Sequence, residues 1–105
     1  MKQAIVIFVT CGSEDEARQI ANELLEKRTA ACVNIIPAVK SQFWWQSSID
    51  KAIESLLIIK TRANLLQKAI SVIKSKHSYE VPEIIALPII GGNTEYLDWI
   101  EKETA

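Results

Sequence analysis

Residues 41 to 48 read SQFWWQSS, so three consecutive aromatic side chains stand directly before turn-forming residues. Aromatic residues make up only 7% of the chain, which makes this cluster unusual. The extended pattern on both sides predicts a hairpin with arms of about residues 31–46 and 49–61. Each arm is far longer than the roughly 5–6 residues of an average strand. The hairpin tip must therefore overhang or bend around the body of the domain.

The aromatic cluster needs a surface that covers it. Because side chains alternate along a strand, Phe43 and Trp45 share one face of the hairpin and Trp44 takes the other. Each ring buries about 150–250 Å² when a partner accepts it, and in water the rings would form an aggregation-prone patch. In one interpretation the hairpin folds back and the rings join the chain's own core. The interpretation we favour is an oligomer in which Phe43, Trp44 and Trp45 are interface residues.

The pattern outside the hairpin predicts one α+β domain over residues 1–105. Strands are expected over residues 3–10, 31–46, 49–61 and 84–90. Helices are expected over residues 14–28, from about 64 to 77, and after 93. The order βαββαβ followed by a helix indicates a ferredoxin-like sandwich with a long hairpin between its second and third strands.

Three side chains are expected to cap these helices. Ser13 precedes Glu16 by three residues, as in a capping box, and Asn64 and Asn93 stand before the other two helical patterns. Pro37 interrupts the second strand, which fits an edge strand or a bulge and not a central ladder.

The predicted sheet also has an apolar face that its own helices do not cover. In a ferredoxin-like sandwich two helices cover one face, so polar alternation is expected on the other face. Residues 3–10 and 56–59 are instead apolar on both faces. The last helix is short, so oligomerisation is the simplest explanation.

The charge and hydropathy of the chain exclude several classes of partner. Its net charge of −1 provides no basic field for nucleic acid. No stretch approaches the roughly 20 apolar residues of a membrane span. The N-terminal apolar run is not followed by a cleavage pattern, so no signal peptide is expected. The cytoplasm is the expected location, where Cys11 and Cys32 stay free thiols.

The soft or borderline metal ligands of the chain are Cys11, Cys32 and His77. The expected strand and helix directions bring Cys11 and His77 to one edge of the sheet and place Cys32 at the opposite edge. A carboxylate from Glu80 or Glu83 could join the first two around one ion, within a chain or across a subunit boundary. Thiolate with imidazole suits copper or zinc. Cys11 and His77 are therefore the predicted metal ligands.

The same residues also have plainer interpretations. His77 at a helix C-terminus can bond backbone carbonyls, and Cys11 can be a strand-end thiol that binds nothing. Cys32 is expected to act as a small buried hydrophobe. The sequence contains no nucleophile elbow and no Ser-His-Asp set, so neither catalysis nor a required cofactor is expected.

Five motifs carry a resemblance to a known family. In chain order they are AACVN (30–34), SQFWW (41–45), ESLLIIKT (54–61), HSYEVPEI (77–84) and YLDWI (96–100). Together they resemble the CutA family, the divalent-cation-tolerance proteins, over nearly the whole chain. The resemblance implies a ferredoxin-like fold and a homotrimer whose sheets pack around a three-fold axis while the hairpins extend strand pairing into neighbours. It also implies tolerance of copper and other divalent ions, with binding of such ions and no chemical reaction.

The chain departs from the family pattern at several positions. Val9 and Lys76 stand where some members carry a cysteine and a second histidine, so two candidate metal ligands are missing. Phe43, Ser47 and Ser78 stand where many members carry tyrosine, glycine and proline.

Two alternative functions stay open at this point. The family resembles trimeric PII signalling proteins in architecture, so a cleft between subunits could hold a nucleotide or another small anion. Lys60, Glu80 and Glu83 are the candidate residues of that cleft. A rigid trimer could also act as a scaffold that docks other proteins. Both alternatives keep the homotrimer and involve neither nucleic acid nor a membrane.

Overall fold

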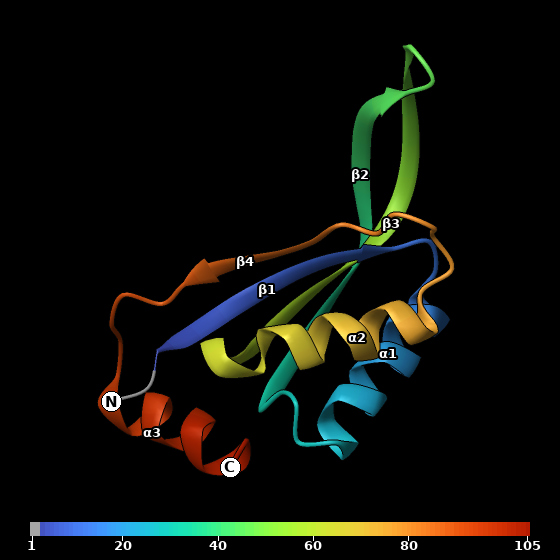
Figure 1. The fold of residues 1–105 in the computed structure, drawn as a ribbon. Helices are drawn as coiled ribbons and strands as arrows, with labels where there is room; N and C mark the ends of the chain where they lie inside the picture. The colour runs from blue at the N-terminus through green and yellow to red at the C-terminus, as the bar shows by residue number, and fades with distance from the viewer. Residues whose placement is uncertain (1–2) are drawn as a thin grey trace.

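Residues 3–105, which the computed structural model describes, form one four-stranded antiparallel sheet and three helices (Figure 1). The strands are β1 (Ala4–Cys11), β2 (Cys32–Trp45), β3 (Ser48–Arg62) and β4 (Ile84–Pro88). The helices are α1 (Glu14–Glu26), α2 (Leu66–Lys76) and α3 (Thr94–Glu103), with a 3₁₀ turn η1 (Ala63–Leu65) before α2. The strand order is β2-β3-β1-β4, and each adjacent pair is antiparallel, as a ferredoxin-like sandwich requires.

The helices α1 and α2 cover one face of the sheet (Figure 1). Alternate residues of β1 point to this face, and Ile7 is fully buried there. Ile7 belongs to one buried cluster with Ile20 of α1, Leu57 of β3 and Ile73 of α2. Each such side chain stabilises the fold by roughly 1.5–3 kcal/mol through burial. This cluster is the core that the apolar periodicity predicts.

The opposite face of the sheet carries an apolar row that α1 and α2 do not cover. Phe8 pairs in register with Ile58 of β3 on one side and with Ile85 of β4 on the other. Ile85 is 51% exposed, and Ile36 and Leu87 on the same face are also exposed. The prediction that this face is apolar and uncovered within one chain is therefore confirmed.

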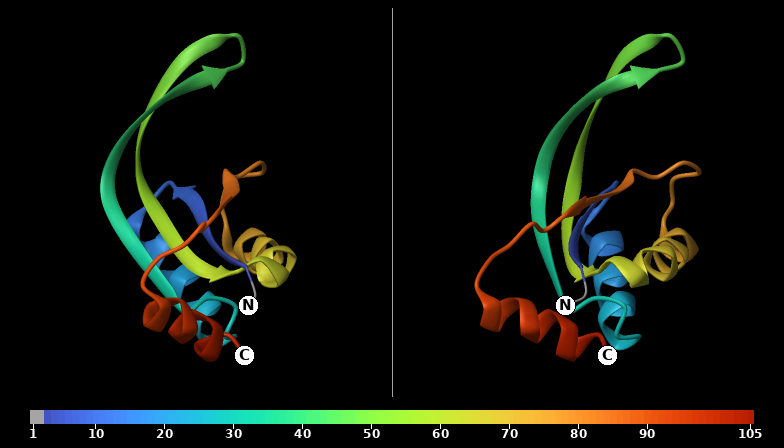
Figure 2. Two further views of the ribbon diagram at one scale, coloured as in Figure 1. Left: turned by 90° about the vertical axis from the view of Figure 1, so that its left-hand side faces the viewer. Right: turned by 60° about the vertical axis from the view of Figure 1, so that its left-hand side comes forward.

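The outer half of the β2–β3 hairpin projects away from the body of the molecule (Figures 1 and 2). The side chain of Trp44 is 74% exposed and that of Trp45 is 59% exposed, so the interpretation in which the rings join the chain's own core is wrong. The turn lies at Gln46 and Ser47, one residue earlier than the Ser-Ser pair that the sequence suggests. Both turn residues have positive φ, as a type I′ hairpin turn requires.

A bulge in β2 sets the direction of the projecting half. The pairing register between β2 and β3 shifts between Ile36 and Val39, and Ala38 has a φ of 60°. A bulge bends its strand and increases the local twist, and the hairpin curves away beyond this point (Figure 2). β2 is also an edge strand of the sheet. Pro37 therefore lies both on an edge strand and at a bulge, the two positions that its sequence context predicts.

Two of the three predicted helix caps are present. The side chains of Ser13 and Asn93 accept hydrogen bonds from backbone N–H groups of the first turns of α1 and α3. The prediction for Asn64 is wrong, because this residue lies inside η1 and α2 begins at Leu66 without a side-chain cap. β4 is also shorter than predicted, since it ends at Pro88.

The last helix is fastened to the end of the sheet where β3 stops (Figure 2). Arg62 is buried there, and its Nε donates to Oγ1 of Thr104 at 2.8 Å. Its Nη2 donates to the carbonyl of Thr104 at 2.6 Å, and Ile100 is fully buried in the same helix. None of the helices that the structure describes has the length and apolarity to span a bilayer.

Candidate metal centre and adjoining cleft

Three potential metal ligands from separate elements meet at one edge of the sheet. Cys11 ends β1, Glu16 lies in the first turn of α1, and His77 follows α2 as its C-cap. Their ligand atoms all lie within 4.8 Å of one another, and within residues 3–105 no other group of three or more such side chains converges in this way. The predicted approach of Cys11 and His77 is therefore confirmed. Within one chain the third group is Glu16, and neither Glu80 nor Glu83 joins it. Their approach across a subunit boundary stays a prediction.

The imidazole of His77 is held on both of its nitrogen atoms. Nε2 lies 2.7 Å from the carbonyl oxygen of Thr10, and Nδ1 accepts a hydrogen bond from the backbone N–H of Tyr79 at 3.0 Å. A neutral ring that carries its proton on Nε2 satisfies both contacts. His77 does bond a backbone carbonyl, but that carbonyl belongs to β1 and not to the helix that His77 ends.

Glu16 is the member of the group that sequence reasoning missed. Its Oε1 accepts a hydrogen bond from the N–H of Ser78 at 3.1 Å, while Oε2 is buried without a hydrogen-bond partner and lies 3.7 Å from Nδ1 of His77. The predicted capping box is thus only half formed, because Ser13 caps the helix while the Glu16 carboxylate turns toward the loop after α2. Glu16 lies in the first turn of the helix that follows β1, and this position was the sequence signal that could have identified it.

The Cys11 thiol is fully buried and stays protonated at neutral pH. Burial raises its pKa from 9.0 to about 12, and the negative charges of Glu16 and Glu54 add to the effect. A metal ion at this position would have to displace the thiol proton. A thiolate, an imidazole and a carboxylate together form a donor set that suits zinc or copper.

Cys32 lies away from this group, as the strand directions predict. It points to the open face of the sheet, where Sγ contacts Oδ1 of Asn34 at 3.9 Å. Its side chain is only half-buried, so the expectation of a buried hydrophobe is wrong. Burial and the nearby Cys32 raise the pKa of Tyr96 in α3. Both cysteines are free in the described part of the chain.

A cleft of about 860 Å³ adjoins the candidate metal centre. It lies between the projecting hairpin and the loop that connects α2 to β4. Its innermost carboxylate is Glu54, which is only 7% exposed and accepts a hydrogen bond from the Tyr79 hydroxyl at 2.8 Å. Burial and this hydrogen bond raise the pKa of Tyr79 to about 12. The lining residues are Thr10, Lys40, Ser41, Gln42, Phe43, Trp45, Asp50, Glu54, Tyr79, Glu80, Val81 and Glu83.

The cleft contains two of the three residues that the sequence assigned to a ligand cleft. Glu80 and Glu83 line it, whereas Lys60 lies on the open face of the sheet and donates to Oδ1 of Asn34. Lys60 therefore adds no positive charge to this cleft, and the cleft between subunits stays a prediction. Its lining has a negative balance, which opposes a nucleotide or another anionic ligand.

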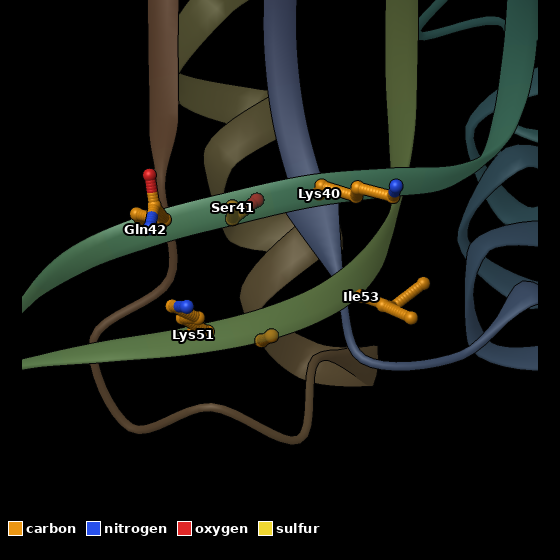
Figure 3. A pocket seen from close by; sticks show the side chains of 6 residues that line it. Lys40, Ser41, Gln42, Lys51 and Ile53 are labelled. Carbon is orange, nitrogen blue, oxygen red and sulfur yellow. The ribbon is translucent and has the colours of Figure 1, made fainter.

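A second hollow, of about 580 Å³, runs along the hairpin itself (Figure 3). Lys40, Ser41 and Gln42 of β2 face Lys51 and Ile53 of β3 there. It lies on the outer part of the hairpin, beyond the residues at which β1 pairs with β3, and most of its side chains are exposed. Such an open ribbon surface supplies no enclosed binding site.

The sequence profile of the CutA1 divalent ion tolerance protein family matches residues 5–103. The chain belongs to this family. The divalent-cation tolerance protein CutA of Thermus thermophilus is 46% identical over 99 residues, which are 94% of this chain and 96% of that protein. The chloroplastic protein CutA 1 of Oryza sativa is 43% identical over 101 residues, or 96% of this chain, but the chain spans only 57% of that longer protein.

Solved structures of family members agree with the fold. The crystal structure of CutA1 from Oryza sativa has a TM-score of 0.96 at 41% identity, over 99% of this chain and 95% of that one. The Thermus thermophilus structure has a TM-score of 0.95 at 45% identity, over 97% of this chain and 99% of that one. Relatives carry names that refer to tolerance of divalent cations and, in different cases, to the chloroplast and the periplasm.

Proposed function

We propose that the protein acts in tolerance of divalent metals by binding a divalent or soft transition-metal ion, without catalysing a reaction. The observation that carries the proposal is the convergence of Cys11, Glu16 and His77, whose ligand atoms lie within 4.8 Å of one another. The buried Oε2 of Glu16 has no hydrogen-bond partner, so a cation there would satisfy it. Copper and zinc are the ions that best match these donors.

The surrounding contacts indicate how the chain would hold the ion. The bond from His77 Nε2 to the Thr10 carbonyl would orient the ring and leave Nδ1 toward Glu16. An ion at Nδ1 would replace the hydrogen bond that Nδ1 accepts from the backbone N–H of Tyr79. An ion at Cys11 would release the thiol proton, because the pKa of that thiol is about 12. The apparent affinity should therefore increase about tenfold for each unit of pH near neutrality.

Calorimetric titration with Zn²⁺, and with Cu⁺ under anaerobic conditions, tests this proposal. Saturable binding is expected in the unaltered protein, with proton release that disappears in Cys11→Ser. Glu16→Gln should weaken binding while it keeps the hydrogen bond to Ser78. Cys32→Ser is the matched control, since it removes the other thiol at a distance from the group. Binding that survives in Cys11→Ser but is lost in Cys32→Ser would place the ion elsewhere.

We further propose that the protein is a homotrimer. The support is the uncovered row of Phe8, Ile58 and Ile85 on the sheet, together with the exposed hairpin rings of Trp44 and Trp45. Sedimentation equilibrium should give about 35 kDa, three times the chain mass of 11.8 kDa. A folded species of one chain mass at the same concentration would contradict the proposal.

We place the protein in a reducing compartment, with the cytoplasm as the proposed location. The support is that Cys11 and Cys32 are both free and lie on opposite faces of the sheet. Fractionation of the native cells with detection by antibody tests this point, and recovery in the periplasmic or membrane fraction would overturn it. The scaffold alternative stays a prediction.

A further inference from the structure

The acidic cleft holds a buried carboxylate whose charge no cation balances. Glu54 is only 7% exposed, and its one hydrogen bond comes from the neutral hydroxyl of Tyr79. No lysine, arginine or histidine forms an ion pair with Glu54 anywhere in residues 3–105. Burial of an unpaired charge is costly, so a carboxylate in this position favours the approach of a cation.

The remaining charges of the cleft act in the same direction. Asp50 on β3 and Glu80 and Glu83 on the loop contribute three further carboxylates, against the single ammonium group of Lys40. None of these three acids takes part in an ion pair within the described chain. Charges of one sign between protein walls raise the local concentration of counter-ions. The charge of this cleft therefore favours a positively charged ligand.

Aromatic rings also line the cleft. Phe43 and Trp45 line the hairpin side of the cleft, and Tyr79 lines the inner end beside Glu54. Ring faces attract organic ammonium groups, and they also pack against the methylene groups that join such ammonium groups. The volume of about 860 Å³ falls within the roughly 300–1,000 Å³ of small-molecule sites.

The spacing of the carboxylates separates an organic cation from a bound metal ion. A metal ion needs ligand atoms that converge on one point. Within the described residues the converging group consists of Cys11, Glu16 and His77, and no carboxylate that lines the cleft belongs to it. The acids that line the cleft do not form a converging group of three, which matches a ligand with several separated positive charges.

We propose that this cleft binds a linear aliphatic di- or polyamine. One ammonium group lies at Glu54, others lie toward Asp50, Glu80 or Glu83, and the methylene chain packs along the rings. The inner end of the cleft, with Glu54 and Tyr79, determines the specificity for the amine. Phe43 and Trp45 form the outer wall, where the proposed subunit contacts also lie.

Calorimetric titration with spermidine tests the proposal, with chelator-washed protein at about 20 mM and about 150 mM salt. Saturable binding at both salt concentrations is expected. Glu54→Gln should weaken it at least about tenfold, since the charge partner is lost. Glu26→Gln, on the exposed end of α1, is the matched control and should leave it unchanged. Should Glu54→Gln fail to fold, the Glu80→Gln, Glu83→Gln pair on the exposed loop should weaken binding in the same direction.

The other outcomes each overturn the proposal. Weak binding that vanishes at the higher salt concentration and is unchanged in Glu54→Gln would indicate nonspecific electrostatic attraction. Equal competition by Mg²⁺ would indicate a metal site, and binding of a lysine-rich peptide but not of spermidine would indicate a protein-docking groove. Cys11→Ser should bind spermidine normally, so failure of the metal proposal and failure of this one are distinguishable.

Discussion

The buried Cys11 thiol should make the stability of this protein fall at alkaline pH. Its side chain has no exposure to solvent, and its pKa rises from 9.0 to about 12 through burial and the charges of Glu16 and Glu54. Above pH 9.0 the unfolded chain loses this proton, while the folded chain keeps it until about pH 12. The unfolded state then binds fewer protons, so the free energy of unfolding decreases as the pH rises. The contribution is complete below pH 9.0 and is lost progressively toward the folded pKa.

The size of the effect follows from the two pKa values. At about pH 10.5 the thiol of the unfolded chain is some 1.5 pH units past its pKa, whereas the folded thiol is still protonated. This difference lowers the free energy of unfolding by about 2 kcal/mol relative to about pH 8. Urea unfolding at both pH values, at one protein concentration and with a reductant present, measures it.

Cys11→Ala isolates the contribution of this thiol. Lysine and tyrosine side chains also titrate in this pH range. They do so in the unaltered protein and in Cys11→Ala alike, so their contribution cancels in the comparison. The loss of stability between the two pH values should therefore be about 2 kcal/mol smaller in Cys11→Ala. Cys32→Ala keeps the Cys11 thiol and should retain the full loss. An equal loss in the unaltered protein and in Cys11→Ala would refute the reasoning.

Three further predictions concern fold and assembly. Arg62→Ala should destabilise the protein by about 2–3 kcal/mol in urea unfolding, because it removes two charge-assisted hydrogen bonds to Thr104; a change below about 0.5 kcal/mol would contradict the anchoring of α3. Ser13→Ala should cost about 1 kcal/mol in the same assay, whereas Asn64→Ala, which removes no cap, should cost much less; equal costs would contradict the cap assignment. Trp44→Ser should shift sedimentation toward smaller species while circular dichroism stays native, and an unchanged assembly would remove this ring from the interface.

Local patterns in the sequence were sufficient for most of the fold. Extended apolar runs rich in β-branched residues predicted the strands, and helical spacing predicted the helices. The caps at Ser13 and Asn93 are formed by side chains that reach only a few residues along the chain. The meeting of Cys11 and His77 was also predictable, because the direction of successive elements decides which edge of a sheet each end reaches. Asn64 shows the limit of such patterns, since the 3₁₀ turn delayed the start of α2.

Only the tertiary structure decided which carboxylates serve the two candidate sites. Glu16 looked like half of a capping box, yet its carboxylate bonds Ser78, 62 positions away. Glu54 falls within the predicted strand over residues 49–61, and only the loop after α2 brings the Tyr79 hydroxyl against its carboxylate. Lys60 lies on the open face of the sheet, apart from Glu80 and Glu83, which line the cleft beside the hairpin. Sequence periodicity specifies the face on which a residue lies, because each element repeats its own geometry. Which residue it contacts on that face depends on how segments that are distant in the sequence pack against each other. A local sequence pattern does not contain this information.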